Sequence, residues 1–222
     1  MSAPFRAALV LATCALVSGC GLLFNRDPLP AREMFRLRLV DSSAIPVVAV
    51  NGGAYPIDGS LAIAPYETPG LYGERGIVFR VGQTSYGAYP SREWAVPLAE
   101  MLGSLTESVL ERNPISREQA VYDPPSRRSH TYIWRGTVRE FEEVDIGTTV
   151  SVAVRLDVKL VRSADDSLIW SGSERIERSV SQPTMDNIVG AMSDAAIDVI
   201  AKLSRTAVHE LSAASSAARA RP

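Results

Sequence analysis

The sequence predicts an α+β fold: a single domain with a mostly antiparallel or mixed β-sheet and two main α-helices packed on one face of it. Residues 132–162 alternate apolar and polar side chains with the period of two that half-buried strands require. Residues 91–112 and 184–211 repeat apolar side chains at helical spacing. Runs of strands together with separate helices are typical of the α+β class.

The N-terminus has the pattern of a lipoprotein signal. Residues 7–17 are almost entirely apolar, and Arg6 is the only charge before them. This run is about half of the ~20 residues that a hydrocarbon core requires, so it predicts a cleaved signal peptide over residues 1–19. Val17-Ser18-Gly19-Cys20 is a lipobox, in which the thiol of Cys20 receives a diacylglyceryl group. An ordinary signal peptide with an incidental cysteine is the disfavoured alternative.

This N-terminal pattern resembles that of bacterial lipoproteins. In the lipoproteins of Gram-negative bacteria, aspartate after the cysteine retains the protein in the inner membrane, and this chain has Gly21 there. The resemblance implies a palmitate-type anchor in the inner leaflet of the outer membrane, with the domain facing the periplasm. Residues 20–33 contain two prolines and no periodic pattern, and we interpret them as the lipidated cysteine and an extended tether.

Composition excludes several classes of function. Without residues 1–19 the chain has 203 residues, enough for one ordinary domain with a real core. Cys14 leaves with the signal peptide and Cys20 carries lipid, so no thiol remains for a disulfide, a metal site or a nucleophile. The formal net charge of −2 becomes −3 when Arg6 is removed, so no basic field attracts nucleic acid.

The domain is predicted to span residues 34–211, and its first half is expected to contain short strands. Residues 34–40 alternate apolar side chains with arginines, as half-buried strands do. Residues 82–89 are rich in glycine and tyrosine and predict a turn region. The other expected strands are apolar runs bounded by proline or glycine, at residues 47–50, 61–64 and 77–81.

The first helix is predicted over residues 91–112. Ser91 can cap its start, and Pro97 must lie near the start or kink the helix. Asn113-Pro114 ends it, and a loop is expected up to residue 128. Its apolar stripe consists of Trp94, Leu98, Met101, Leu102, Leu105 and Val109.

The strongest strand pair is predicted over residues 132–144 and 148–162. Every second residue of the second strand is apolar for most of its length, and the residues between are mainly polar or charged. One face of this pair is therefore expected in the core and the other in water. A turn at Asp165-Asp166 leads to a third strand at residues 168–180.

A final helix follows the sheet. Thr184 can cap it, Asp186 lies in its first turn, and its apolar stripe runs to about Leu211. Residues 212–222 are a low-complexity run of alanine, serine and arginine that ends in proline, and we expect them to form a frayed, disordered tail.

No catalytic, cofactor or metal site is predicted. His130 and His209 have no third ligand at metal-binding spacing, so surface positions are favoured for both. Paired carboxylates act as general acid and base only where burial separates their pKa values. The densest acidic cluster, which we interpret as a solvated strand face or hairpin end, is Glu140, Glu142, Glu143 and Asp145.

The candidate binding residues are Tyr86, Tyr89 and Trp94. Tyrosine and tryptophan favour positions that are apolar at one end and wet at the other, so we hypothesise a contact with a protein or an acyl chain. The alternative is that Trp94 belongs to the core at the first turn of a helix and that the tyrosines cover it.

Six short segments lie in order along the domain behind the lipobox: Phe35-Arg36-Leu37, residues 61–65, Phe79-Arg80, Tyr89 five residues before Trp94, residues 97–102, and Phe141-Glu142 ahead of a valine-rich strand. Together they resemble the ABC-type transport auxiliary lipoproteins, a group that includes proteins like paraquat-inducible protein C. The chain departs from the expected pattern at Phe35 and Phe79, where tyrosine is expected.

The resemblance implies a non-catalytic accessory that docks an ABC-type lipid transport system. The implied partners are an MCE-domain substrate-binding protein, a permease and an ATPase, and the resemblance also allows a homo-oligomer. Two alternatives stay open. One is a structural outer-membrane lipoprotein that helps another envelope machine assemble, and the other is a periplasmic lipid carrier with an apolar cavity.

Replacing Cys20→Ser tests the predicted anchor. Two or three acyl chains, at ~0.8 kcal/mol per buried methylene, hold a protein at a bilayer durably, and a serine hydroxyl accepts none of them by this route. We expect the variant to leave the membrane pellet after cell fractionation while the parent chain sediments with it. Continued sedimentation of the variant with the envelope would contradict the prediction.

Overall fold

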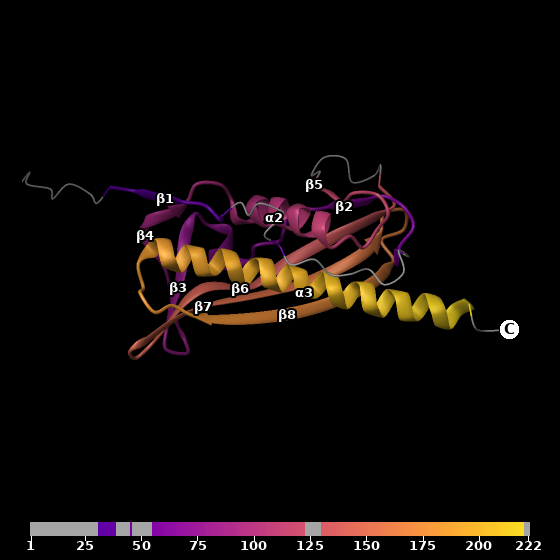
Figure 1. Cartoon of the computed structure of the whole chain (residues 1–222). Coiled ribbons are helices and arrows are strands. Elements are labelled where there is room, and N and C mark those ends of the chain that lie inside the picture. Colours follow the sequence, from indigo (N-terminus) through magenta and orange to yellow (C-terminus); the bar gives the residue numbers. More distant parts are fainter. Residues whose placement is uncertain (1–30, 39–44, 46–54, 123–129, 220–222) are drawn as a thin grey trace, which may run out of the picture. The chain divides into compact units, whose positions relative to one another are not determined.

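A mixed eight-stranded sheet with two α-helices on one face forms the part of the chain that the computed structural model describes, which is residues 31–38, 45, 55–122 and 130–219 (Figure 1). This confirms the predicted α+β class. The described residues from Glu33 onward belong to one compact unit. The predicted signal peptide, Cys20 and the strand expected at residues 47–50 lie outside the described residues.

Three long antiparallel strands are the frame of the sheet: β6 (Tyr132–Ile146), β7 (Thr149–Arg162) and β8 (Leu168–Ser179). β6 pairs with β7 along its whole length, and β8 pairs with the other edge of β7. Gly147 makes the β6–β7 turn at φ +66°, and Asp166 has φ +54° in the next turn. The predicted hairpin and third strand are therefore confirmed.

The second edge of β6 carries shorter strands. β2 pairs with its first residues and β3 with its last, both in parallel, and β3 continues through β4 to β1. Glu67 bridges the gap between them, since its N–H bonds the Gly136 carbonyl at 2.8 Å. The bounds are β1 (Glu33–Phe35), β2 (Leu61–Ile63), the 3₁₀ turn η3 (Gly70–Gly73), β3 (Gly76–Val81), β4 (Ser85–Trp94) and β5 (Val121–Tyr122).

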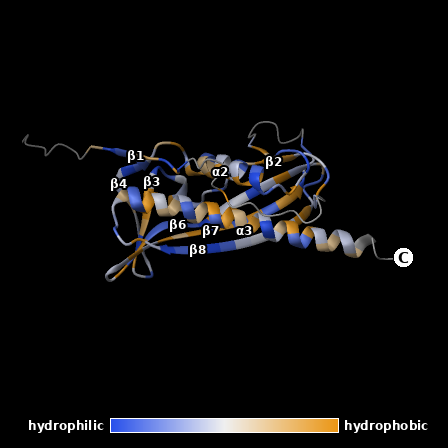
Figure 2. Ribbon diagram, in the orientation of Figure 1, coloured by the Kyte–Doolittle hydropathy of each residue, from blue (hydrophilic) through white to orange (hydrophobic). Residues whose placement is uncertain are grey.

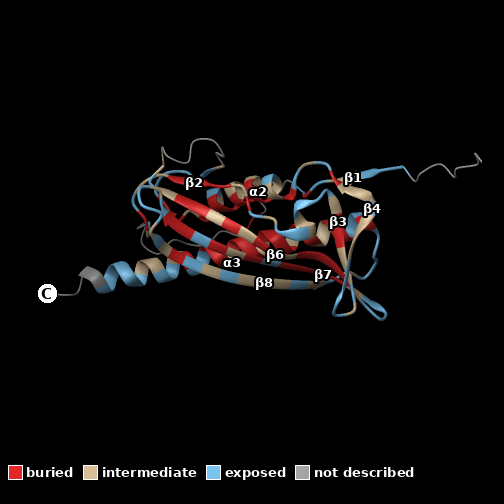
Figure 3. Ribbon diagram, turned by 180° about the vertical axis from the view of Figure 1, so that it is seen from behind, coloured by how far each residue is buried: buried red, intermediate tan, exposed pale blue. Residues whose placement is uncertain are grey.

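The inner face of the long strands is buried by α2 (Leu98–Arg112) and α3 (Met185–Arg219). Figure 2 shows hydrophobic and hydrophilic residues alternating along these elements, and Figure 3 shows buried residues concentrated in β6 and β7. We call the opposite face of the sheet the outer face. The cross-strand rows of the inner face are Trp134–Leu160–Trp170, Gly136–Val158–Gly172, Val138–Leu156–Glu174, Phe141–Val154–Ile176 and Glu143–Val152–Arg178.

The predicted first helix and the turn before it are wrong in part. Residues 85–94 form strand β4, so Ser91 caps no helix and Trp94 lies at a strand end. The helix begins only at Leu98, after Pro97 as its N-cap. A proline disfavours helical geometry in the residue before it, and β4 obtains its hydrogen bonds from β3 and β1 instead. The predicted end at Asn113 is confirmed.

The predicted end of the last helix is also wrong. Thr184 caps α3 as expected, since its Oγ1 accepts the N–H of Asn187 at 3.4 Å. The helix then continues past Leu211 to Arg219, where a disordered tail was expected. Alanine has the highest helix propensity, and this exposed part only extends a helix whose earlier turns are packed on the sheet, so no new nucleus is needed.

β1 is shorter than the predicted strand over residues 34–40. After Phe35 the backbone turns to the helices, because the N–H of Leu37 donates to Met101 Sδ at 3.4 Å and the N–H of Arg38 to Ser193 Oγ at 3.1 Å. Leu37 is still buried, so the alternating apolar residues after Phe35 pack into the core although they no longer belong to a strand. Among the described residues, no helix is both long and apolar enough to cross a bilayer.

Gly136→Ala tests the tightest packing of the core. A Cβ at this position would lie 2.0 Å from Cε1 of Tyr66, whose hydroxyl bonds Thr106 Oγ1 at 2.8 Å and Trp134 Nε1 at 3.2 Å. The ring cannot move without losing these bonds, so we expect the free energy of unfolding to fall by roughly 2–3 kcal/mol. Gly190→Ala, where a Cβ meets open space, is the matched control and should cost nothing in denaturant unfolding.

Candidate functional site

The three candidate binding residues all lie on β4, but the structure does not gather them into one cluster. Trp94 is 2% exposed, and its ring meets Phe141 edge-on with 6.0 Å between centroids. It therefore belongs to the core, as the alternative interpretation held. Tyr86, in contrast, is 51% exposed, with the guanidinium carbon of Arg80 5.9 Å from its ring centroid.

Tyr89 is held by a buried carboxylate. Its hydroxyl donates to Glu143 Oε2 at 2.9 Å, and its ring lies 4.9 Å from that of Phe79. The guanidinium carbon of Arg92 lies 4.9 Å from the same ring. Burial, with the hydrogen bond to Glu143, raises the pKa of Tyr89 to about 12, and burial also raises the pKa of Glu143. These contacts join β4 to β6 and occupy the tyrosine hydroxyl.

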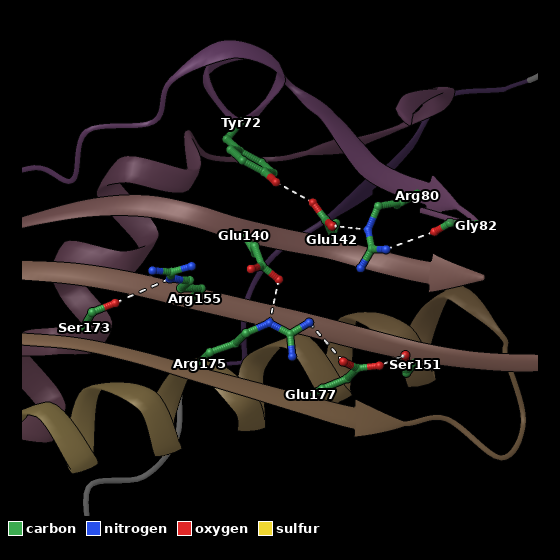
Figure 4. Close-up of polar contacts among 10 residues, drawn as sticks. All are labelled: Tyr72, Arg80, Gly82, Glu140, Glu142, Ser151, Arg155, Ser173, Arg175 and Glu177. Carbon is green, nitrogen blue, oxygen red and sulfur yellow. Dashed lines mark hydrogen bonds and ion pairs between the residues drawn. The ribbon is translucent and has the colours of Figure 1, made fainter. Parts of the chain in front are cut away.

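A second buried carboxylate, Glu142, lies on the outer face of β6 (Figure 4). Arg80 Nε donates to its Oε1 at 2.8 Å, and the Tyr72 hydroxyl donates to its Oε2. Arg80 Nη1 also donates to the Gly82 carbonyl at 2.9 Å. The hydrogen bond from Arg80 to Glu142 raises the pKa of Arg80. Burial, and then the hydrogen bond from Tyr72 to Glu142, raise the pKa of Tyr72. Both groups therefore remain donors at neutral pH.

The interpretation of residues 140–145 as a solvated strand face is wrong for Glu142 and Glu143, which are both buried. The reason is that η3, β3 and β4 cover this end of β6 and supply a donor to each carboxylate. The donors Tyr72, Arg80 and Tyr89 are 70, 62 and 54 residues away in the chain. Local sequence patterns cannot reveal partners at such separations.

The outer face of the long strands carries a charged network (Figure 4). Arg175 donates from Nε to Glu140 at 2.8 Å and from Nη2 to Glu177 at 2.9 Å. Ser151 donates to the other oxygen of Glu177 at 3.0 Å. The bonds from Arg175 and then Ser151 lower the pKa of Glu177. This carboxylate is therefore ionised at neutral pH.

Beside this network the outer face is hollowed by an open groove of about 580 Å³. Its charged lining residues are Arg135, Arg139, Arg155, Lys159, Glu67 and Asp157. Two of the arginines are already paired, Arg135 with Asp166 at 2.7 Å and Arg139 with Asp157 at 2.6 Å. In the part of the chain that the structure describes, no three histidine, cysteine or acidic side chains are grouped as metal ligands.

Three exposed apolar side chains mark the tips of two neighbouring hairpins: Val81 (48% exposed), Tyr86 (51%) and Ile146 (51%). We call them the hairpin-tip patch. The β3–β4 and β6–β7 turns lie side by side, since the Gly82 N–H donates to the Asp145 carbonyl at 2.8 Å, and both tips are exposed (Figure 3).

Sequence analysis missed two members of the hairpin-tip patch, Val81 and Ile146. A signal for them was present: each directly precedes a glycine, Gly82 or Gly147, that turns the chain at positive φ. An apolar residue directly before such a turn is the last residue of its strand, where neighbouring strands bury its side chain least.

Comparison with known proteins identifies the family. The model of the ABC-type transport auxiliary lipoprotein component family matches residues 42–204. This chain belongs to that family. Its family is that of auxiliary components of ABC-type transport systems. The resemblance noted in the sequence is therefore confirmed.

Solved structures share the fold of this auxiliary component. XCC0632 of Xanthomonas campestris, of the family DUF330, has a TM-score of 0.63 at 19% identity over 83% of this chain and 99% of its own. A weaker similarity, from which nothing about the fold follows, is to the PelC dodecamer of Paraburkholderia phytofirmans, with a TM-score of 0.44 at 12% identity over 71% of this chain and 90% of that chain. The comparison with curated proteins finds no match.

Replacing Arg80→Met tests how the hairpins are held. The substitution leaves Glu142 as a buried charge without its counter-ion, and breaking such a pair costs roughly 3–5 kcal/mol of unfolding free energy in denaturant titration. The double variant Arg80→Met, Glu142→Met should recover most of that loss. Arg135→Met is the control, because its ion pair with Asp166 is exposed and worth under about 1 kcal/mol. Equal losses for Arg80→Met and Arg135→Met would contradict the assignment.

Proposed function

We propose that this protein is an acyl-anchored docking component of an MCE-containing ABC lipid transporter, facing the periplasm from the outer membrane. The observation that carries the proposal is the family match over residues 42–204, almost the whole domain, behind a lipobox at Cys20. An MCE-domain substrate-binding protein is the direct partner, and a permease and an ATPase complete the system. Anchoring confines the domain to a thin layer and raises its effective concentration for a partner that reaches the membrane.

The hairpin-tip patch is the docking surface in this proposal. Val81, Tyr86 and Ile146 are large, exposed and apolar. The strand register puts Tyr86 and Ile146 on the face of Arg80 and Val81 on the opposite face, so the patch wraps around the hairpin tips. Exposed apolar side chains concentrated in one region are typical of contact sites. The pairs Arg80–Glu142 and Tyr89–Glu143 hold both hairpins to the sheet just behind the patch. The patch is therefore presented by a rigid base, which lowers the entropy cost of binding. We expect its occupant to be an apolar surface of the MCE-domain protein.

Packing favours docking over the carrier alternative. The long strands and both helices share one filled core in which Trp134, Phe141, Leu156 and Met192 are fully buried. The apolar pocket beside α2, lined by Leu37, Met101, Leu105 and others, measures about 130 Å³. Ligand sites commonly measure about 300–1,000 Å³, so this pocket does not accommodate a lipid acyl chain without rearrangement.

Crosslinking of the full-length protein in intact cells, followed by pull-down, tests the proposal. Recovery of an MCE-domain protein is the expected result. Recovery of a secretin or polysaccharide exporter alone would overturn it and favour the structural alternative. Extraction of the purified protein should yield no stoichiometric lipid by mass spectrometry, and bound lipid would favour the carrier.

A triple variant tests the docking surface itself. Val81→Ser, Tyr86→Ser and Ile146→Ser together remove the apolar side chains of the patch. Burial of each is worth about 1 kcal/mol or more, so we expect the affinity for the MCE-domain protein, and with it the recovery, to fall by about a hundredfold. Leu168→Ser is the matched control, because Leu168 is 57% exposed at the start of β8, at the end of the long strands opposite to the β6–β7 turn. Unchanged recovery with the triple variant would remove the patch from the interface.

A further inference from the structure

The edge of β8 is unpaired. Among the described residues this strand pairs only with β7, and α3 covers its inner face (Figure 1). The Val180 N–H donates to the Val150 carbonyl of the neighbouring strand at 2.8 Å. Backbone groups of alternate residues point to opposite edges of a strand, so those of Ser173, Arg175 and Glu177 point away from β7. No hydrogen bond to these outward backbone groups is found within the described residues.

The side chains along this edge are ordered in an unusual way. Residues 174–178 read Glu-Arg-Ile-Glu-Arg, so the charges on the two sides of Ile176 are opposite in sign at equal distance. Edge strands are commonly protected from aggregation by charged side chains, especially lysine, and charges of one sign would repel those of a second copy. With the order in this chain, antiparallel pairing with a second copy has one register in which each of these charged side chains faces one of opposite sign.

We propose that β8 pairs antiparallel with β8 of a second copy about a twofold axis at Ile176, so that one sheet continues through both subunits. Arg175 then lies opposite the partner subunit's Glu177 on the outer face. Glu174 lies opposite the partner subunit's Arg178 on the inner face. Because the interface is isologous, each of these pairs occurs twice. Opposite charges at directly facing positions stabilise antiparallel strands.

Backbone geometry selects the same register independently. The outward-pointing backbone groups belong to odd-numbered residues, so a hydrogen-bonded pair must join odd residues of both copies. Pairing about Ile176 places Arg175 opposite residue 177 and Ser173 opposite residue 179, which satisfies this requirement. The nearest allowed alternatives place Arg175 opposite itself or Glu177 opposite itself, and both create like-charge pairs.

The four charged side chains remain accessible although each has contacts within its own chain. Arg175 and Glu177 are 39% and 43% exposed, and Arg178 and Glu174 are 41% and 31% exposed. Glu174 accepts from Lys202 at 2.9 Å, and Arg178 pairs with Asp198. The charged groups from packed elements that contact these side chains are Lys202 and Asp198 of α3 and Glu140 of β6, which pairs with Arg175 at 2.8 Å. A second partner would extend these pairs into networks.

The dimer is expected to be weak in dilute solution. A single strand pair buries less than the roughly 1,000 Å² of a stable interface, so confinement of both copies to one membrane supplies the effective concentration. The dimer rests on the proposed membrane anchor but not on an MCE partner, and the proposed transport function does not depend on the dimer.

Disulfide trapping tests the register. Ile176→Cys places the thiol opposite itself across a non-hydrogen-bonded pair, where the Cα atoms lie about 4.5 Å apart, within reach of a disulfide. With full-length protein in phosphatidylcholine vesicles under mild oxidation, we expect a dimer on a non-reducing gel. Leu168→Cys on the same strand, with the unchanged chain as background, is the control and should give no dimer above it. Equal crosslinking of both variants would overturn the proposal.

Charge reversal tests the pairing and shows at the same time that the variants fold. In the Ile176→Cys chain, Arg175→Glu alone or Glu177→Arg alone replaces two opposite-charge pairs by two like-charge pairs. We expect about tenfold less disulfide, equivalent to about 1.4 kcal/mol. A mixture of the two variants makes every pair complementary and should restore the crosslink between differently tagged chains. The proposal would be overturned if either charge-reversed variant formed as much disulfide as the parent Ile176→Cys chain. It would also be overturned if mixing the two variants did not restore the disulfide between them.

Discussion

The alternation of apolar and polar residues along β6, β7 and β8 is the constraint on which the rest of the structure depends. A shift of one residue in either pairing would turn Trp134, Leu160 and Trp170 from the core to water, so the register is strongly specified. Once it is set, the inner face must be covered, and the amphipathic helices α2 and α3 cover it. β6 also offers its second edge, to which β2 and β3 attach. The long meander thus places every other element.

Charge is buried where the short strands join this frame. Glu142 and Glu143 are adjacent on β6 and point to opposite faces, and each is neutralised or hydrogen-bonded by an element from the first half of the domain. A buried carboxylate without its donors is costly, so the β3–β4 hairpin and η3 have one favourable way to dock. The same contacts leave the turns beyond them exposed, with Val81, Tyr86 and Ile146 at their ends.

Membership of the auxiliary lipoprotein family and this architecture together suit a protein that positions other components. The two surfaces proposed for contact share no residue: the hairpin-tip patch belongs to the turns of β3–β4 and β6–β7, and the free edge belongs to β8. A partner and a second copy therefore use different chemistry, apolar burial in one case and backbone hydrogen bonds with ordered charges in the other. Neither requires a reactive side chain.

The sequence by itself determined the features that depend on neighbours in the chain: the lipobox before Cys20, the period-two strands at residues 132–162, the cap at Thr184 and the helical stripe after it. Helix α2 was predicted with the wrong start because local spacing does not show that Ser91 and Trp94 have strand partners in β3 and β1. Only the tertiary structure decided that Trp94 is buried, that Glu142 and Glu143 meet Arg80, Tyr72 and Tyr89, and that β8 has a free edge. These facts join residues 47 or more positions apart, or depend on which of the described strands is last in the sheet, and no local periodicity encodes either.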